Sequence, residues 1–267
     1  MAATQNCIAA GTFYPADATR LRRTITEYLN VVALPGPPPK ALIVPHSGYL
    51  LCGTVAASAY VSLAALRRTI TRVVLLGPAH WTPFTGLATT RAKTFLTPLG
   101  MVSVKQKSVT QALSLPFVHI MEEAYAREHG IEVQLPFLQE VLEDFSLVPL
   151  LVGDAPPEQI TEALDLLWGG PETLIIISSD LSHYYDYSTA RRMDYTTAQA
   201  IEMLQPQHIC AEHACGWRAI QGLLFTARKH GMQAKTVVLR NSADTDEQRT
   251  EVVGYGSFLF TKEHRAS

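Results

Sequence analysis

The stretch ALIVPHSGYLLCGTVAASAY, residues 41–60, joins an apolar run, a short polar turn and a run of small residues. The apolar run at 41–44 stops at Pro45-His46, which predicts a buried strand with a histidine just beyond its end. The segment 53–66 that follows predicts a helix. A strand that leads through a polar turn into a helix is the repeating unit of α/β proteins, so this stretch indicates the fold class.

The rest of the chain repeats this alternation. Five further apolar runs have the length and composition of strands buried on both faces: 72–77, 147–153, 173–178, 235–240 and 254–260. Six stretches have helical character: 16–32, 53–66, 128–145, 157–168, 188–204 and 216–231. The pattern predicts an α/β fold in which a central, largely parallel or mixed sheet carries helices on both faces. Without internal repeats or a shift in composition, residues 1–267 are predicted to form a single domain.

The composition narrows the class of protein. A formal net charge of -2 over 267 residues offers no electrostatic footprint for nucleic acid, and no basic run suggests a membrane surface. We also expect no apolar stretch long enough to span a bilayer, and no signal peptide at the amino terminus. The four cysteines lack CxxC spacing, so neither a zinc knuckle nor a disulfide framework is indicated. A soluble cytoplasmic protein is therefore expected.

Polar residues that could carry chemistry follow four of the predicted strands: His46, His80, the pair Asp180 and His183, and Asp244. In an open parallel sheet, ligand sites form beyond the carboxyl ends of the strands, so these side chains could share one crevice. Two histidines and a carboxylate with open positions are typical of a non-haem Fe(II) site. These residues could also have structural roles instead of functional ones: Asp180 could cap a segment, and Asp244 could belong to an Asx turn.

Two more residues are candidates for binding a substrate. His129 lies at the start of a predicted helix, where it could contact a ligand or act as a structural hydrogen-bond donor. Cys215 comes just before another helix, whose dipole would favour a thiolate. It could equally be a small buried residue that allows close packing beside Gly216.

Ten segments together resemble the Memo-like family, in particular its bacterial and archaeal members called AmmeMemoRadiSam system protein B. The resemblance extends from about Ile8 to Phe260. The segments are AGTFYPAD, ALIVPHSGY, VVLLGPAHW, FLTPLG, EHGIEVQLPFLQ, LVPLLVGD, ISSDLSHY, HACG, NSADT and VVGYGSF. PHSGY, GPAHW and SSDLSHY are the most specific of them in combination.

The resemblance implies a fold related to class III extradiol dioxygenases, which hold Fe(II) with two histidines and a carboxylate. His46 and His80 would take the two histidine positions. His183 would take the acid–base position, with Asp180 three residues before it to orient the ring.

The third metal ligand is where this sequence departs from the family pattern. By the resemblance, animal members use a cysteine in the loop that matches NSADT, and this chain has no cysteine there. Asp244 is the nearest candidate and would restore a carboxylate triad. A shift in the alignment would instead give the position to Ser242 or Thr245.

Two classes of function remain open from the sequence. The first is a metal-dependent oxidoreductase or dioxygenase with Fe(II), or with copper or zinc, acting on an unidentified small molecule. The second is a non-enzymatic adaptor that binds a peptide or an anion in the same crevice. The resemblance also suggests radical-SAM and AMMECR-type proteins as partners.

Overall fold

Four parallel strands form the centre of the fold. The computed structural model describes residues 3–30, 37–246 and 248–262. The central strands lie side by side in the order β8, β3, β9, β2. Their bounds are β2 (Ala41–Val44), β3 (Arg72–Pro78), β8 (Ser146–Val152) and β9 (Thr173–Ser178). Because all four run the same way, their carboxyl ends lie at one edge of the sheet, where a site can form.

Shorter and antiparallel strands extend the sheet on both sides, so the sheet is mixed. On one side β12 runs antiparallel to β2, and β11 and β10 pair with β12. On the other side β6 and β4 pair with β8, and β5, β1 and β7 continue outward. The bounds are β1 (Thr4–Gln5), β4 (Leu87–Thr89), β5 (Thr94–Thr97), β6 (Gly100–Val104), β7 (Val118–Ile120), β10 (His183–Tyr185), β11 (Met232–Asn241) and β12 (Val252–Lys262).

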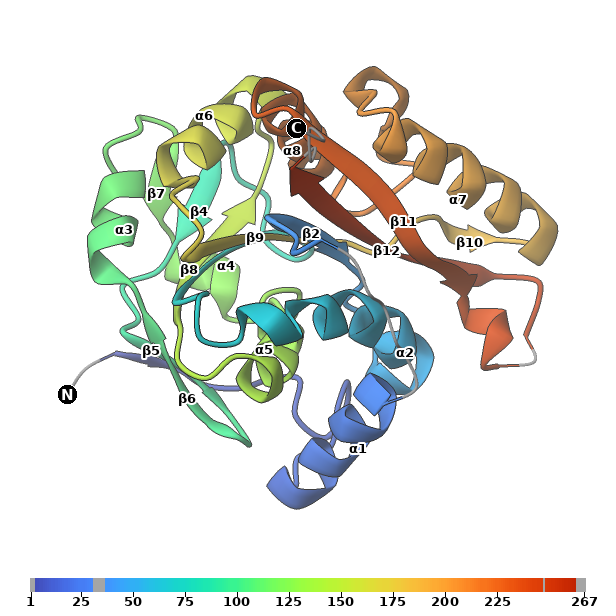
Figure 1. Cartoon of the computed structure of the whole chain (residues 1–267), viewed down its shortest axis with the longest axis horizontal. Coiled ribbons are helices and arrows are strands. Elements are labelled where there is room, and N and C mark those ends of the chain that lie inside the picture. Colours follow the sequence, from blue (N-terminus) through green and yellow to red (C-terminus); the bar gives the residue numbers. More distant parts are fainter. Residues whose placement is uncertain (1–2, 31–36, 247, 263–267) are drawn as a thin grey trace.

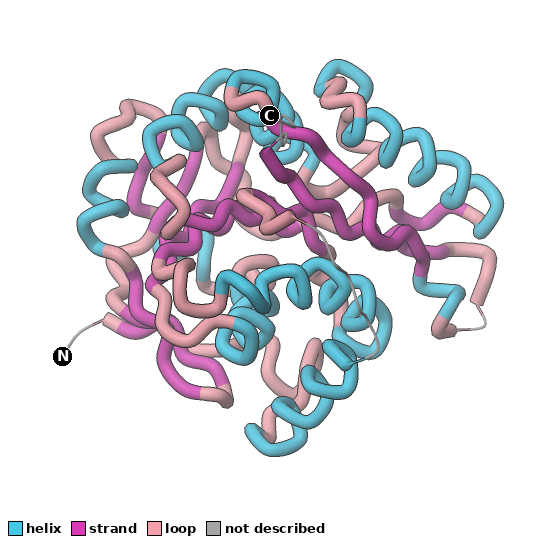
Figure 2. Tube along the Cα trace, in the orientation of Figure 1, coloured by secondary structure: helices cyan, strands magenta, loops and turns pink. Residues whose placement is uncertain are grey.

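Helices cover both faces of the sheet, which confirms the predicted architecture. Figures 1 and 2 show α1, α2 and α5 on one face and α6, α7 and α8 on the other. The α-helices are α1 (Ala18–Asn30), α2 (Tyr49–Tyr60), α3 (Gln106–Ala112), α4 (Glu122–Tyr125), α5 (Leu135–Val141), α6 (Pro157–Leu167), α7 (Tyr187–Glu202) and α8 (Trp217–Lys229). Four short 3₁₀ helices are η1 (Val61–Leu66), η2 (Glu132–Gln134), η3 (Pro206–His208) and η4 (Ser242–Asp244).

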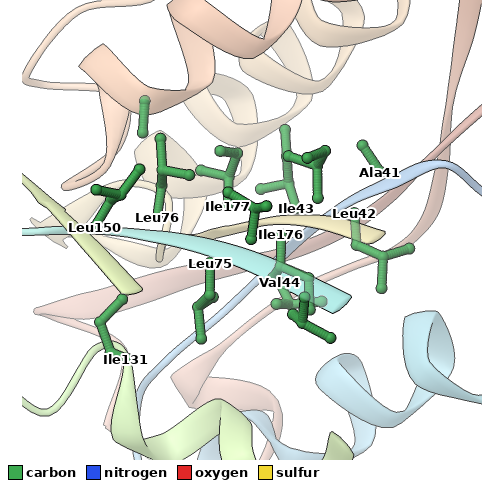
Figure 3. Packing of buried hydrophobic residues seen from close by; sticks show 14 of the residues in the cluster. Ala41, Leu42, Ile43, Val44, Leu75, Leu76, Ile131, Leu150, Ile176 and Ile177 are labelled. Carbon is green, nitrogen blue, oxygen red and sulfur yellow. The ribbon is translucent and has the colours of Figure 1, made fainter. Parts of the chain in front are cut away.

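The central strands are largely apolar, with polar residues only at their ends, because helices pack on both of their faces. Successive side chains of a strand point to opposite faces, so Leu76 and Ile177 lie on one side of the sheet and Leu75 and Val44 on the other (Figure 3). All four side chains are completely buried. The bounds of β2 and β9 are those predicted from the sequence, because an uninterrupted apolar run has only one place in such a layered fold.

Two expectations from the sequence need correction. The run at 235–240 is part of β11, which is largely half-exposed rather than buried on both faces, because it forms an outer hairpin with β12. The stretch Tyr49–Leu66, α2 followed by η1, is long and apolar enough to cross a membrane, although we expected no such stretch. Of the residues in this stretch, 56% are buried, and the stretch packs on α1, β2 and β12, as the core helix of a soluble protein does.

Truncating a side chain between the central strands and their helices should destabilise the protein strongly. Ile177→Ala removes a fully buried side chain from β9 and should lower the free energy of unfolding by about 2 to 5 kcal/mol. Met101→Ala, at a β6 position that is 68% exposed, is the matched control and should change it by less than about 0.5 kcal/mol. Urea denaturation of both variants measures the difference, and equal midpoints would contradict this account of the core.

Candidate metal centre

His46 and His80 meet at the carboxyl edge of the sheet. Each follows its strand by two residues, His46 after β2 and His80 after β3. These strands are not neighbours, because β9 lies between them. The loops nevertheless bring the two rings together edge to face, with centroids 5.1 Å apart. His46 is buried and His80 is exposed, so the pair lies at the boundary between core and solvent.

Cys215 completes a three-residue group with these histidines. It lies two residues before α8, and its Sγ is 3.3 Å from His46 Nε2. One donor atom from each of His46, His80 and Cys215 lies within 4.8 Å of the others. With metal–sulfur and metal–nitrogen bonds of about 2.3 and about 2.0 Å, a 3.3 Å separation gives an angle of about 100° at an ion. The donors therefore fit a shared transition-metal ion.

The other nitrogen of each histidine ring is held by a hydrogen bond. Ser178 Oγ donates to the Gly130 carbonyl at 2.6 Å, so it accepts from His46 Nδ1 at 3.0 Å. Glu128 Oε1 accepts from His80 Nδ1 at 2.9 Å. In both rings Nε2 is then the nitrogen that could bind a metal ion, and in His46 it contacts Cys215 Sγ at 3.3 Å. Such partners fix the tautomer and direction of metal-binding histidines in proteins of known metal content.

Burial and neighbouring charges set the protonation of the three donors. Burial lowers the pKa of His46 to about 4, so its ring is neutral near pH 7, as a ligand must be. Burial alone would lower the pKa of His80, but its hydrogen bond to Glu128 and the charge of that carboxylate outweigh burial and raise it. Burial and the Asp180 charge raise the pKa of Cys215 to about 12. The expected thiolate is therefore a thiol in the free protein, and a metal would displace its proton.

Asp180 joins the loops that carry the group. Its Oδ1 accepts from the His46 backbone N–H at 2.8 Å, and its Oδ2 accepts from the Ser47 hydroxyl at 2.6 Å. Its own backbone N–H donates to Cys215 Sγ at 3.2 Å. The carboxylate thus positions the β2 loop, while the backbone of the same residue positions the cysteine.

Close packing at Gly216 allows the cysteine to reach the histidines. A Cβ at this position would lie 2.7 Å from the Ser179 Cβ, which is closer than real side chains approach. The Gly216 N–H donates to Ser179 Oγ at 2.9 Å. The start of α8 therefore lies directly against the end of β9.

His129 lies beside the group without joining it. Its ring stacks on His80 at 5.1 Å between centroids and packs on Phe13 at 4.3 Å. Its Nδ1 is 3.7 Å from Glu128 Oε1, and His80, Glu128 and His129 form a second group of potential ligands. Because His80 Nδ1 already donates a hydrogen bond to Glu128, the main role of this second group is to orient the His80 ring.

Neither of the other two predicted residues, His183 and Asp244, belongs to a group of potential metal ligands in the part of the chain that the structure describes. His183 is the first residue of β10; its side chain is half-buried and its ring contacts Tyr184. The Asp180 carboxylate accepts hydrogen bonds from the His46–Ser47 segment rather than from the His183 ring. Asp244 is exposed, caps η4 by accepting from the Asn241 N–H, and is separated from β2 by β12. The structure therefore brings Cys215, and not Asp244, to the two histidines.

The neighbours of Asp244 do not enter the group either. Ser242 Oγ accepts from the Val253 N–H, and Thr245 is exposed beyond η4. The cysteine comes from the HACG segment rather than from the NSADT loop, because α8 packs against β9 while the end of β11 lies two strands away from β2.

Sequence reasoning missed Glu128 and Ser178 as supports for the histidines. The Glu128-His129 pair offered a signal, because a carboxylate beside a histidine often orients metal ligands. Nothing in the sequence distinguished Ser178 from any other serine at a strand end, since its role depends on β9 lying between β2 and β3.

Comparison with known proteins agrees with this architecture. The profile of the family described as "Memo-like protein" matches residues 6–259. The chain belongs to the Memo-like family. A MEMO1 family protein of Sulfolobus acidocaldarius is 32% identical, with 94% of this chain and 97% of that protein covered. One of Thermotoga neapolitana is also 32% identical, with 95% and 98% covered.

A solved structure shows the same fold at lower sequence similarity. The uncharacterized protein JW3007 from Escherichia coli K12 superimposes with a TM-score of 0.50 and 16% identity, covering 80% of this chain and 98% of that chain. This likeness concerns the fold alone. The central sheet and its helices are thus shared more widely than the sequence.

Removing the charge that orients His80 should weaken metal binding. Glu128→Gln keeps the shape of a buried side chain but replaces a carboxylate that accepts three hydrogen bonds, two from His80 and one from Gly130. We expect metal affinity to fall about 10- to 100-fold. Glu123→Gln, the same exchange at an exposed position, is the control and should bind as the wild type does. Competition with a chromophoric chelator measures both, and unchanged affinity in Glu128→Gln would contradict this role.

Proposed function

We propose that this Memo-like protein binds one redox-active transition-metal ion through His46 Nε2, His80 Nε2 and Cys215 Sγ, and serves as a metal-dependent oxidoreductase for a small molecule. The observation that carries the proposal is the convergence of these three donors, with the second nitrogen of each ring already hydrogen-bonded. Such preparation is unnecessary for histidines that only fill space, and it is what metal ligands require.

The chemistry of the donors selects the class of metal. Magnesium and calcium prefer carboxylate and carbonyl oxygens, whereas imidazole and thiolate suit iron, copper and zinc. Replacing the expected carboxylate with Cys215 makes the set softer than that of the extradiol enzymes. Iron and copper change oxidation state and zinc does not, so an oxidoreductase would use one of the first two. Such a bound ion would supply one-electron and oxygen chemistry.

A cavity beside the centre offers room for a small substrate. It has a volume of about 240 Å³ and is lined by the segments that follow β3 and β8 and by the start of α8, including Cys215. Trp217 and Phe84 contribute apolar surface, and Arg218 lies in the lining, paired with Asp154 at 2.6 Å. A small, partly polar molecule matches this lining in size and character.

His183 is the residue we propose for proton transfer, as the likeness of its DLSH segment to the extradiol enzymes implies. It follows Asp180, which holds the centre, by three residues, and it is half-buried. An imidazole side chain can accept a proton from a substrate and return it during the reaction. Rotation of the side chain toward the crevice when substrate binds is part of this proposal.

The ligand assignment predicts which variants lose bound metal and which keep it. The double variant His46→Ala/His80→Ala should lose stoichiometric metal, and Cys215→Ser should lower affinity sharply because a hydroxyl is a poor replacement for a thiolate. Asp244→Asn should keep a full equivalent, because that side chain caps η4. Elemental analysis of protein purified without oxygen and without chelator, with circular dichroism as a check on folding, tests all three. Full metal in the double variant, or its loss in Asp244→Asn, would refute the assignment.

The enzymatic part predicts a separate effect at His183. His183→Ala should keep its metal and lose about two to four orders of magnitude in turnover. Oxygen uptake with iron- or copper-loaded protein over a panel of catechols and thiols is the measurement, and Tyr184→Ala, at the exposed neighbouring position, is the control. A metal-loaded wild type that consumes no oxygen with any of them would favour the adaptor function.

A further inference from the structure

A second pair of metal-binding side chains lies on the loop that leads to Cys215. This loop connects η3 to α8 and contains Cys210 and His213. Cys210 Sγ is 3.1 Å from His213 Nδ1, and the His213 N–H donates to the Cys210 carbonyl at 3.0 Å, which closes a turn. Cys210 is exposed and His213 half-exposed. Neither residue belongs to the centre described above.

The backbone fixes the state of the His213 ring. The Cys210 backbone N–H donates to His213 Nδ1 at 3.1 Å, so this nitrogen is an acceptor and the ring proton of the neutral form lies on Nε2. The single Nδ1 lone pair accepts from this backbone N–H, and the Cys210 sulfur lies beside it at 3.1 Å. In this tautomer Nδ1 can bind a metal ion when the ion displaces the weak hydrogen bond from the backbone.

The separation of the two donors suits a single ion. With bonds of about 2.3 Å to sulfur and about 2.0 Å to nitrogen, a 3.1 Å separation gives an angle of about 90° at the ion. A thiolate and an imidazole select soft and borderline cations such as Cu(I) and Zn(II) over magnesium or calcium. Two ligands on an exposed turn make a weak and open site, which releases its ion readily.

We propose that Cys210 and His213 capture a soft or borderline metal ion at the surface and pass it to the centre at Cys215. Capture follows from the pair itself, whereas the transfer step rests on the function proposed above. His46 is only 1% exposed, whereas His80 is exposed and Cys215 half-buried, so an ion enters the centre from the side of these two residues. Cys210 and Cys215 are five positions apart in the sequence, a span of at most about 18 Å, and the turn shortens it.

Tethering explains why such a pair would matter. An ion held on the same loop meets the buried donors at an effective concentration in the millimolar range, far above the micromolar concentration of free ion in a loading experiment. The pair should therefore speed loading without changing the final affinity of the centre. This separates it from a residue that supports the centre itself, such as Glu128.

Cobalt(II) tests capture, because thiolate ligation gives an intense charge-transfer absorption. In Cys215→Ser the buried thiolate is gone, and we expect a weaker cobalt–thiolate band to remain. The band should disappear in Cys215→Ser/Cys210→Ser and weaken in Cys215→Ser/His213→Ala. Cys215→Ser/Cys7→Ser is the matched control and should keep it. Absence of the band in Cys215→Ser, or its persistence without Cys210, would overturn the capture site.

Stopped-flow loading of otherwise wild-type protein with cobalt(II) tests transfer. We expect Cys210→Ser to reach the same final occupancy about tenfold more slowly, with Cys7→Ser loading at the wild-type rate. Equal rates for Cys210→Ser and wild type would overturn transfer. A wild type that lacks the Cys215 centre altogether would refute the proposed function and transfer together. In that case the cobalt–thiolate band in Cys215→Ser still tests whether Cys210 and His213 capture a metal ion.

Discussion

The hydrogen bonds of Asp180 hold together segments that are distant in the sequence. The carboxylate is buried and accepts from the backbone of His46 and from the Ser47 hydroxyl, and the Asp180 N–H reaches Cys215 Sγ. A buried carboxylate is stable only when its oxygens are satisfied, so the loop after β2 must keep its position for the fold to persist. The geometry of the candidate centre depends on this constraint.

The parallel sheet supplies the rigid frame for these loops. Because β9 lies between β2 and β3, Ser178 at the end of β9 can accept a hydrogen bond from His46 and orient its ring. Gly216 lets the start of α8 bring Cys215 directly against the end of the same strand. Each donor is thus fixed by a strand end or by a helix start rather than by a mobile loop. Rigid elements hold ligands within the few tenths of an ångström that a metal site requires.

The ligand set has consequences for the proposed chemistry. Two imidazoles and a thiolate form a softer set than two imidazoles and a carboxylate of the same total charge, so the resemblance of the sequence to the extradiol enzymes does not imply a shared reaction. The thiol also stays protonated in the free protein, which couples metal binding to the release of a proton. The exposed Cys210–His213 pair is built from the same donor types without that burial.

The sequence by itself determined the layered fold and the two histidine positions, because uninterrupted apolar runs predict buried parallel strands, and residues just beyond strand ends must lie at one edge of the sheet. It could not determine the third member of the group. Asp244 follows a predicted strand and Cys215 precedes a predicted helix. The local sequence pattern does not indicate which of the two lies near the end of β2. The tertiary structure decided this through long-range packing: β12 separates β11 from β2, whereas α8 packs on β9. Glu128 and Ser178 likewise gain their roles only when segments distant in the chain are brought into hydrogen-bonding distance.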